Sequence, residues 1–467
     1  MKTGPLTYAQ QRLWFLNAFD PDDPSHNLAY AYRVRGALDV PALEAAFTAV
    51  VARHDALRTR FTEVGGEPRA VVEDPAPVVA ERIDAASADE ARRIVAERTN
   101  RPFDLTAEPP LHVTVVRIAP DDHVLCVVTH HINSDGWSLN VLQEEVAAHC
   151  AGRALPPPPL QYSELAAADE PPGDLGWWVE QLSGAPDLEL PTDRPRPAER
   201  TSAGGQTEIP LPAPLVRAVH ELARKTRCTP YMVLVAAYEV LLARHSGQTD
   251  FCVGTPAAGR GRPELERVVG YLSTTMVLRC DLSGDPSFTD LVRATRRSVL
   301  SALSHPDVPF ERLVGALGTE RDLSRTPIFQ AMFALHTYGD VADPLPGLST
   351  GPFPLGWHPA RCDLSLDLRE QPDGSLLAYL IHSADLFDGT TAERMGARYR
   401  QLLESVVAAP ELPVSELGLL PVAERELLAS WDGPVVELPP VTLVDLVRER
   451  AEVAPDAVAV VSGTTVL

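Results

Sequence analysis

The spacing of apolar side chains predicts an amphipathic helix early in the chain. Leu43, Ala46, Phe47 and Val50 recur on one face of the segment Pro41–Arg53. Proline is tolerated in the first turn of a helix, where its missing N–H costs no hydrogen bond. We therefore expect a helix that starts at Pro41 and packs by one face.

Two β-branched runs further along the chain predict neighbouring strands of one sheet. They are His112–Ile118 and Val124–Thr129, and a short turn-like segment separates them. The period then changes, so that Trp137–Cys150 is typical of a helix packed by one face. The pair His130-His131 lies between the second strand and this helix. Two rigid elements would hold such a loop, which suits catalysis better than a free surface loop does.

The second half of the chain alternates in the same way. We expect a helix over Thr229–His245 and strands over Phe251–Thr255 and Thr275–Asp281. A chain of 467 residues is too long for one ordinary core. Proline-rich stretches at 156–159 and 171–172 interrupt regular structure, so we place a lobe junction near residue 173.

This reading divides the chain into four parts, the third of which looks like a linker along a domain surface. The parts are an N-terminal lobe (1–173), a C-terminal lobe (174–420), a linker (421–440) and a final segment (441–467). The final segment would form only one helix and one strand. So few residues cannot bury a core, so we expect them to begin a larger domain.

Composition narrows the classes of partner and the compartment. The formal net charge of −23 argues against nucleic acid, because phosphate binding depends on Lys and Arg. The N-terminus lacks the charged start and apolar middle of a signal peptide. No segment approaches the ~20 apolar residues that span a bilayer. We therefore expect a cytoplasmic protein without a membrane partner.

The cysteines do not suggest a metal site or a disulfide framework. Six cysteines are scattered without CxxC spacing, and most lie in apolar surroundings. We interpret them as reduced core residues. No metal is expected.

The segment His130–Ser138 carries the most chemical information in the chain. Two adjacent histidines point in different directions, so at most one of them faces a given pocket. Asp135 followed by Gly136 predicts a tight turn with a carboxylate available to pair with an arginine. The alternative interpretation is an ordinary surface turn with a solvated aspartate.

These residues resemble the HHxxxDG signature of the nonribosomal peptide synthetase condensation superfamily, and Asp135–Ser138 resembles the members that form peptide bonds. Further similar segments follow in the order of that family and extend the resemblance over about residues 5–430. They are Leu6–Leu16, Arg53–Thr59, Tyr162 in a weakened motif, Val269–Arg279, His305–Glu311 and Arg321–Pro327. The segment Val441–Val461 resembles the opening of an adenylation domain.

The resemblance implies an α/β fold of two chloramphenicol-acetyltransferase-like lobes, arranged as a V-shaped pseudo-dimer with a central tunnel. It implies two partners, an upstream donor carrier protein and a downstream acceptor carrier protein. Each would present a phosphopantetheine arm, so this chain itself would bind no cofactor. The implied reaction is attack of the acceptor amine on the donor thioester.

The resemblance also assigns roles to individual residues. His131 matches the catalytic histidine, which we expect to hydrogen-bond the amine, with base catalysis left open. His130 is expected to be structural. Asp135 needs a cation if it is buried, and the implied partner is Arg58. The Gly136 amide is the oxyanion candidate.

Three further residues are candidates for the tunnel or its gate. Trp137 could gate the acceptor side, and core packing is the alternative. Ser273 and Thr274 lie where relatives commonly carry a Phe-Val-Asn-Thr run, so Thr274 replaces the usual Asn. Pro306 replaces a usual Gln, and Glu164-Leu165 replaces an Asp-Tyr pair. These departures affect the expected tunnel floor and donor preference.

Several rival functions share the same signature. An epimerisation domain carries HHxxxDG, but the adenylation-like segment that follows here favours condensation. An ester-forming or otherwise modified condensation domain has the same residues. A docking platform without catalysis tends to lose the histidines, which are intact here. A free-standing acyl-CoA transferase would not be followed by an adenylation domain. The histidine loop and the segment Leu6–Leu16 resemble those of members that accept an L-configured donor.

Overall fold

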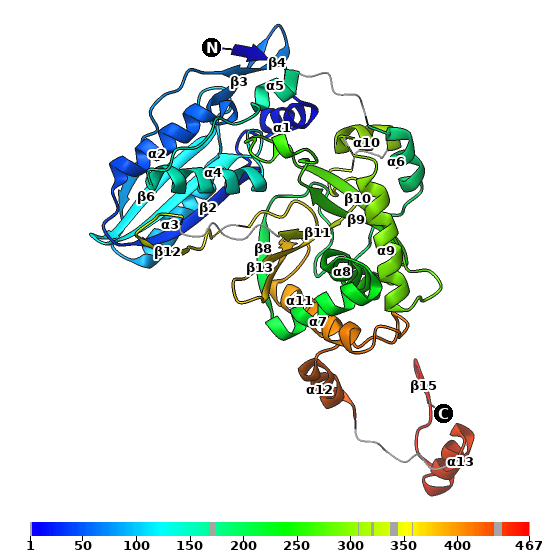
Figure 1. The fold of residues 1–467 in the computed structure, drawn as a ribbon. Coiled ribbons are helices and arrows are strands. Elements are labelled where there is room, and N and C mark those ends of the chain that lie inside the picture. Colours follow the sequence, from blue (N-terminus) through cyan, green and yellow to red (C-terminus); the bar gives the residue numbers. More distant parts are fainter. Residues whose placement is uncertain are drawn as a thin grey trace. The chain divides into compact units, whose positions relative to one another are not determined.

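The computed structural model describes residues 2–167, 173–306, 308–318, 322–336, 344–356, 358–433 and 441–466. The chain divides into two compact units, Met1–Leu419 and Leu420–Leu467 (Figure 1). The first unit contains two sheets of five and six strands, each with its own helices. Each of these sheets, together with its helices, forms one lobe.

The first lobe is built on a five-stranded sheet in the order β12-β2-β7-β6-β5, with a small sheet β1-β4-β3 beside it. Its elements are β1 (Lys2–Gly4), α1 (Tyr8–Phe19), β2 (Asn27–Arg35), α2 (Val40–Arg53), η1 (Asp55–Arg58), β3 (Thr59–Val64), β4 (Glu67–Val72), β5 (Glu81–Asp84), α3 (Ala88–Thr99), β6 (Leu111–Ala119), β7 (Asp122–His130), α4 (Gly136–Cys150) and α5 (Tyr162–Ala167).

Strand β7 is the central element of this lobe because both of its faces are buried. Leu125 and Val127 pack with α2 and α4, whereas Val124 and Val128 pack in a separate core with α1 and α3. Side chains alternate between the two faces of a strand, so a nearly continuous apolar run can serve both cores. The predicted helices at 41–53 and 137–150 and the two predicted strands are confirmed, with ends within about two residues.

The second lobe is built on a six-stranded sheet in the order β10-β9-β11-β13-β14-β8. The second half of the chain supplies the following elements, all of which except β12 belong to this lobe: α6 (Leu175–Leu182), β8 (Gly204–Leu211), α7 (Ala213–Thr226), α8 (Pro230–Ser246), β9 (Asp250–Ala257), η2 (Pro263–Leu265), β10 (Thr274–Asp281), α9 (Phe288–Leu303), α10 (Phe310–Leu317), β11 (Ala331–His336), β12 (Ser349–Pro352), β13 (Leu364–Glu370), β14 (Leu376–Ser383) and α11 (Gly389–Ala408). The helix predicted at 229–245 and both predicted strands are present.

One strand of the second half of the chain belongs to the first lobe. β12 pairs antiparallel with β2, with Ser349 opposite Arg35 and Pro352 opposite Tyr32. Val268 and Val269 also pack in the core of α2 and α4. A division of the chain at residue 173 therefore does not separate the lobes completely. A strand of only four residues has too weak an alternation of apolar and polar side chains to be assigned to the sheet of either lobe from sequence.

The second unit contains two helices and a short hairpin. They are α12 (Val422–Trp431), α13 (Leu443–Val453), β15 (Val461–Ser462) and β16 (Thr465–Val466). Neither helix buries a residue. The segment interpreted as an irregular linker thus begins as a helix at 422–431. Its remaining residues at 434–440 lie outside the described residues, as do Pro171, Pro172, Asp307 and Arg321.

The cysteines follow the expectation with one exception. Four are buried, Cys228 is half-buried, and all six are free thiols. Cys150 is exposed, because it ends α4 on the side facing away from the core. Within the described residues, no three His, Cys, Asp or Glu side chains gather as a metal-binding group, and no helix has the length and apolar character needed to cross a membrane.

Candidate active site

The histidine loop connects the central strand of the first lobe to the helix that follows it. β7 ends at His130, and α4 begins at Gly136. Asp135 is the N-cap of α4, and its Oδ1 accepts a hydrogen bond from the Ser138 amide at 2.8 Å. Such a cap satisfies one of the amides that the first helical turn leaves without a partner. The loop is thus fixed at both ends by regular structure.

The Asp135 carboxylate is buried, with 1% of the residue exposed, and it joins the two lobes. Arg260 donates from Nη1 to Oδ2 at 2.8 Å and from Nη2 to Oδ1 at 3.0 Å. Oδ2 also accepts from the Leu272 and Ser273 amides at 3.1 and 2.9 Å. Four donors from the segment 260–273 therefore converge on one side chain of the first lobe.

The predicted pairing of Asp135 with Arg58 is wrong. Arg58 lies in η1 and donates from Nη1 to the Glu73 carbonyl, so it braces the β3–β4 region instead. The cation is Arg260, which is 202 residues further along the chain than Arg58 and comes from the other half of the chain. The resemblance of Arg53–Thr59 to a family motif favoured Arg58, but a buried carboxylate pairs with whichever guanidinium the fold brings within reach.

Arg260 is held as firmly as its partner. Its side chain is 2% exposed. It also donates to the carbonyls of Ala258 and Val268 at 2.9 and 3.1 Å, and its guanidinium lies 5.7 Å from the centre of the Trp137 ring. A buried bidentate pair with such additional hydrogen bonds loses about 3–5 kcal/mol when one partner is removed.

His130 is part of the core. It is 3% exposed, and its Nδ1 accepts a hydrogen bond from the Ile132 amide at 3.1 Å. Burial, followed by the charges of His131 and Arg361, lowers the pKa of His130 to about 3. The ring is therefore neutral and holds the turn of the loop, as the structural role predicted for it requires.

His131 faces the opposite way and is partly exposed. Its ring packs edge-on against Tyr271, with ring centres 4.5 Å apart. Within the described part of the chain, its buried Nδ1 has no hydrogen-bond partner. Burial, and next the charge of Arg361, lowers the pKa of His131 to about 3. Nδ1 is closed off from solvent, so only Nε2 of this neutral ring can accept a hydrogen bond from a substrate.

Hydrogen bonds to three other segments of the first lobe fix the backbone of the loop. Gln10 donates from Nε2 to the Ile132 carbonyl at 3.0 Å, and Asn133 donates from Nδ2 to the Thr59 carbonyl at 2.7 Å. The His131 amide donates to the His26 carbonyl at 2.8 Å. These contacts come from three separate segments of the first lobe, so the position of His131 depends on the fold of the whole lobe.

The remaining predicted site residues lie close to the loop, in different roles. Gly136 is the first residue of α4, so its amide is one of the N–H groups at the positive end of the helix dipole. Trp137 is half-buried and donates from Nε1 to the Glu266 carbonyl at 2.8 Å. The Ser273 amide binds Asp135, and Thr274 begins β10.

Tyr162 and Gly270 form a contact that the sequence alone did not indicate. A Cβ added at Gly270 would lie 2.1 Å from the Tyr162 ring, so glycine is required there. The Tyr162 hydroxyl donates to the Tyr271 carbonyl at 3.0 Å. Tyr162 thus supports the backbone of the residue that packs on His131. Both residues were noted in family-like motifs, but their contact could only come from the fold.

A further ion pair connects the lobes through two other family-like segments, Leu6–Leu16 and His305–Glu311. Arg12 of α1 donates from Nη1 to Glu311 of α10 at 3.1 Å. Their side chains are 39% and 26% exposed, so the pair is worth at most about 1 kcal/mol. Its contribution is to align the two helices more than to stabilise the fold.

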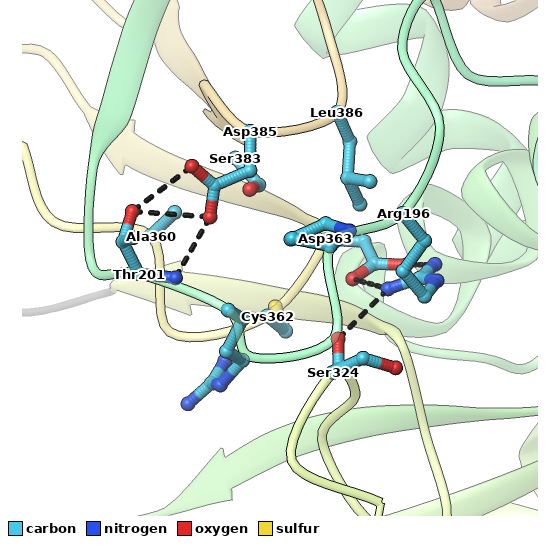
Figure 2. Close-up of a pocket in the computed structure, with 11 residues that line it drawn as sticks. Arg196, Thr201, Ser324, Ala360, Cys362, Asp363, Ser383, Asp385 and Leu386 are labelled. Atoms are coloured by element: carbon cyan, nitrogen blue, oxygen red, sulfur yellow. Dashed lines mark hydrogen bonds and ion pairs between the residues drawn. The ribbon is translucent and has the colours of Figure 1, made fainter.

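In the described part of the second lobe lie a small cavity and a larger groove, and neither of the two is lined by the histidine loop. The cavity in Figure 2 has a volume of about 10 Å³, enough for about one water molecule. Figure 2 shows Arg196 facing Asp363 and Ser324, and Thr201 facing Asp385, so its polar groups are already paired. A larger groove of about 800 Å³ runs past Trp177, Arg279 and Arg297.

Comparison with known families gives one match that spans nearly the whole chain. The family model described as "Condensation domain" matches residues 1–429. One of the linear gramicidin synthase proteins of Brevibacillus parabrevis is 37% identical over 483 residues. The alignment covers 98% of this chain and 10% of that protein, so the chain spans about a tenth of the relative's length.

Solved structures share the fold of the chain. The X-domain from teicoplanin biosynthesis is 30% identical, with a TM-score of 0.79 over 89% of this chain and 97% of that chain. AB3403, a four-domain nonribosomal peptide synthetase bound to AMP and glycine, is 21% identical. It superimposes with a TM-score of 0.83 over all of this chain and 38% of that protein. The two-lobed chloramphenicol-acetyltransferase-like fold is confirmed.

The first prediction concerns the cross-lobe ion pair. Replacement of Arg260 by Ala leaves the buried Asp135 without its cation, so the free energy of unfolding should fall by about 3–5 kcal/mol. Arg262→Ala is the matched control, because Arg262 lies in the same segment but is 56% exposed and 3.9 Å from Glu264. Its effect should stay below about 1 kcal/mol. Equal effects of the two variants in urea denaturation would contradict the assignment.

The second prediction concerns the pH dependence of stability. The pKa of His130 is lowered to about 3 in the fold, so protons bind the unfolded chain preferentially as pH falls below about 6.5. The free energy of unfolding that depends on a neutral His130 is fully present above pH 6.5, and it is lost progressively as the pH falls towards 3. His130→Asn should therefore reduce the slope of unfolding free energy against pH by about 1.4 kcal/mol per unit between pH 4 and 6.

The slope is measured by urea denaturation at a series of pH values. An Asn side chain can still accept the Ile132 amide, so the variant is expected to fold. The same slope in the variant and the parent would show that His130 is not buried in its neutral form.

Proposed function

Because the chain belongs to the condensation domain family of nonribosomal peptide synthetases, which are amide-bond-forming acyltransferases, we propose that it joins a donor acyl group to an acceptor amine. The donor is an aminoacyl or peptidyl thioester, and the acceptor is the α-amine of a second aminoacyl thioester. Both are carried on phosphopantetheine arms of carrier proteins, one upstream and one downstream. The arms belong to these partners.

The observation that carries this proposal is the state of His131. Its ring is neutral and partly exposed, and it sits on a loop fixed by β7, α4 and the pair of Asp135 with Arg260. An amine that attacks a thioester becomes positively charged as the C–N bond forms. A fixed imidazole that accepts a hydrogen bond from this nitrogen orients it and stabilises the charge that develops.

The low pKa also bears on whether His131 acts as a base. A free α-amine has a pKa of about 7.7–8.0, so part of the acceptor is already neutral at cellular pH. An imidazole with a pKa near 3 holds a proton poorly, so it favours hydrogen-bond acceptance over lasting protonation. The tetrahedral intermediate then collapses, the C–S bond breaks, and the amine proton is passed on to the departing thiolate or to water.

The start of α4 supplies a candidate for the oxyanion. The Gly136 amide lies at the N-terminus of a 15-residue helix, where backbone N–H groups carry a partial positive charge. A carbonyl oxygen placed there would gain negative charge during attack and be stabilised by this amide. Trp137, Ser273 and Thr274 lie beside the loop and are proposed to shape the space around the two substrates.

The configuration of the donor and the domain that follows are proposed from sequence motifs. The histidine loop resembles members that accept an L-configured donor. The segment 441–467 resembles the opening of an adenylation domain, which would place the acceptor's activating domain directly downstream. Both are supported by motif resemblance.

Two alternatives would leave the same fold. An ester-forming or otherwise modified condensation domain would use an acceptor hydroxyl in place of the amine. A docking platform would recruit another enzyme without catalysis, and the X-domain, which is 30% identical, has a solved complex with OxyB. The intact pair of histidines favours catalysis over docking.

The third prediction tests the role of His131. His131→Ala should remain folded and lose about 10²–10⁴-fold in the single-turnover rate of transfer between loaded carriers, because positioned acid–base groups contribute about that factor. His130→Ala is the control for a structural effect, and it should lower the melting temperature. A His131→Ala rate within threefold of the parent would favour the docking platform.

A further inference from the structure

Tyr271 is the side chain that packs on the ring of His131. It belongs to the segment 260–273, which comes from the second half of the chain and crosses into the first lobe. The ring centres of the two residues are 4.5 Å apart, in an edge-on arrangement. Tyr271 also packs against both apolar cores of the first lobe. Its ring is therefore fixed beside the imidazole, at the point where the two cores meet.

The backbone of Tyr271 is held from two sides. The Tyr271 carbonyl accepts from the Tyr162 hydroxyl at 3.0 Å. The amide of the next residue, Leu272, donates to Asp135 Oδ2 at 3.1 Å. The carbonyl and this amide belong to one peptide bond, so both of its polar groups are bonded to the first lobe. A ring that is packed and carried on such a backbone holds its hydroxyl in a defined place.

The hydroxyl of Tyr271 is not used by the protein. In the part of the chain that the structure describes, it makes no hydrogen bond, and its oxygen is accessible to solvent. The residue as a whole is half-buried. A tyrosine packed in this way usually bonds its hydroxyl to a protein group when the hydroxyl is buried. The Tyr271 hydroxyl instead faces open space, and it remains available to a ligand.

This hydroxyl lies between the two accessible ends of the histidine loop. Residues 132–135 of the loop are buried, whereas His131 is half-buried and Gly136 is exposed. Tyr271 packs on the first of these ends. At the other end, Asp135 directly precedes Gly136 and accepts the Leu272 amide. One acceptor, Nε2 of His131, and two donors, the Gly136 amide and the Tyr271 hydroxyl, therefore border the same part of the structure.

The hydroxyl stays in the form that donates. Burial raises the pKa of Tyr271 above its usual value, which is already about 10. The nearby cations Arg12 and Arg361 act in the opposite direction, whereas the carboxylates of Glu311 and Asp135 act with burial. A phenol of this kind is neutral at cellular pH and keeps its proton for a hydrogen bond.

We propose that Tyr271 is a further catalytic residue, whose hydroxyl donates a hydrogen bond to the carbonyl oxygen of the donor thioester. The inference rests on the proposed function and deepens it. As the amine nitrogen forms the C–N bond, the π electron pair of the carbonyl moves onto the oxygen. A fixed donor at this oxygen stabilises the charge that develops there. Tyr271 would share this task with the Gly136 amide, while His131 accepts a hydrogen bond from the nitrogen.

The hydroxyl keeps its proton throughout the reaction. When the electron pair on the oxygen returns to carbon, the C–S bond breaks and the thiolate leaves with the bonding pair. The amine proton passes to this thiolate or to water. Tyr271 thus supplies only a hydrogen bond that becomes stronger as the oxygen gains charge, which is the kind of interaction that lowers a barrier.

The experiment removes the donor and leaves the ring in place. Tyr271→Phe keeps the packing on His131 and deletes a hydroxyl that has no bond in the fold, so its melting temperature should match that of the parent. Incorporation of 3-fluorotyrosine at position 271 keeps a hydroxyl that donates more strongly. Tyr30→Phe is the matched control, because Tyr30 is also half-buried but packs on Tyr32, with ring centres 5.7 Å apart. Single-turnover rates are measured over a range of loaded-carrier concentrations.

We expect Tyr271→Phe to lose about 10²-fold in the rate at saturating carrier, since loss of one oxyanion donor typically costs about 10²–10³-fold. The carrier concentration that gives half of this rate should stay within about threefold of the parent, because the interaction is made only in the transition state. The 3-fluorotyrosine chain and Tyr30→Phe should keep the parent rate within about threefold. A merely structural role would lower the melting temperature or weaken carrier binding instead.

A Tyr271→Phe rate within about threefold of the parent at saturation would overturn the proposal, since that is well below a tenfold effect, or 1.36 kcal/mol. If this variant does not fold, O-methyltyrosine at position 271 keeps the ring without a donor, and a parent-like rate has the same consequence. The two proposals fail in different ways. An active parent with an unaffected Phe variant removes only the role of Tyr271, whereas a folded parent that forms no amide removes the proposed function and this role with it.

Discussion

The buried ion pair of Asp135 with Arg260 is the interaction on which the candidate site depends. Asp135 caps α4, ends the histidine loop and accepts two backbone amides from the segment 272–273. One carboxylate therefore fixes the start of a helix, the end of a loop and the approach of the second lobe. Burying two charges is costly, and that cost is offset only because every acceptor position of the carboxylate is used.

The neutral state of the two histidines also follows from the burial of this loop. His130 and His131 are adjacent in sequence but face opposite ways, because β7 ends between the two cores of the first lobe. One becomes a core residue that accepts a backbone amide, and the other packs edge-on against Tyr271 and stays partly exposed. Burial and nearby cations keep both rings neutral at cellular pH. A neutral acceptor is the form that an attacking amine needs.

Local patterns in the sequence were sufficient for much of the fold. The helices α2, α4 and α8 and the strands β6, β7, β9 and β10 followed from periodicity, and the place of the histidine loop followed from them. The residues that meet across the lobes did not follow. Arg260 and Asp135 are 125 positions apart, and Arg361 and Ser25 are 336 apart.

Long-range pairs of this kind leave no periodic signal, which is why Arg58 was preferred to Arg260. The exchanged strand β12 was missed for a related reason. Its four residues include Gly351 and Pro352, which are unusual in strands, and only pairing with β2 makes them extended. The helix α12 was also missed, because its flanking prolines suggested a linker.

We propose that this chain forms an amide between two carrier-bound substrates through His131. The most direct measurement mixes the chain with a donor carrier loaded with an aminoacyl thioester and an acceptor carrier loaded with a second one, and follows both carriers by intact-protein mass spectrometry. We expect the acceptor carrier to gain the mass of the donor acyl group, joined through its α-amine, while the donor carrier returns to the free thiol. Two carriers that keep their original loads in the presence of the folded parent chain would contradict it.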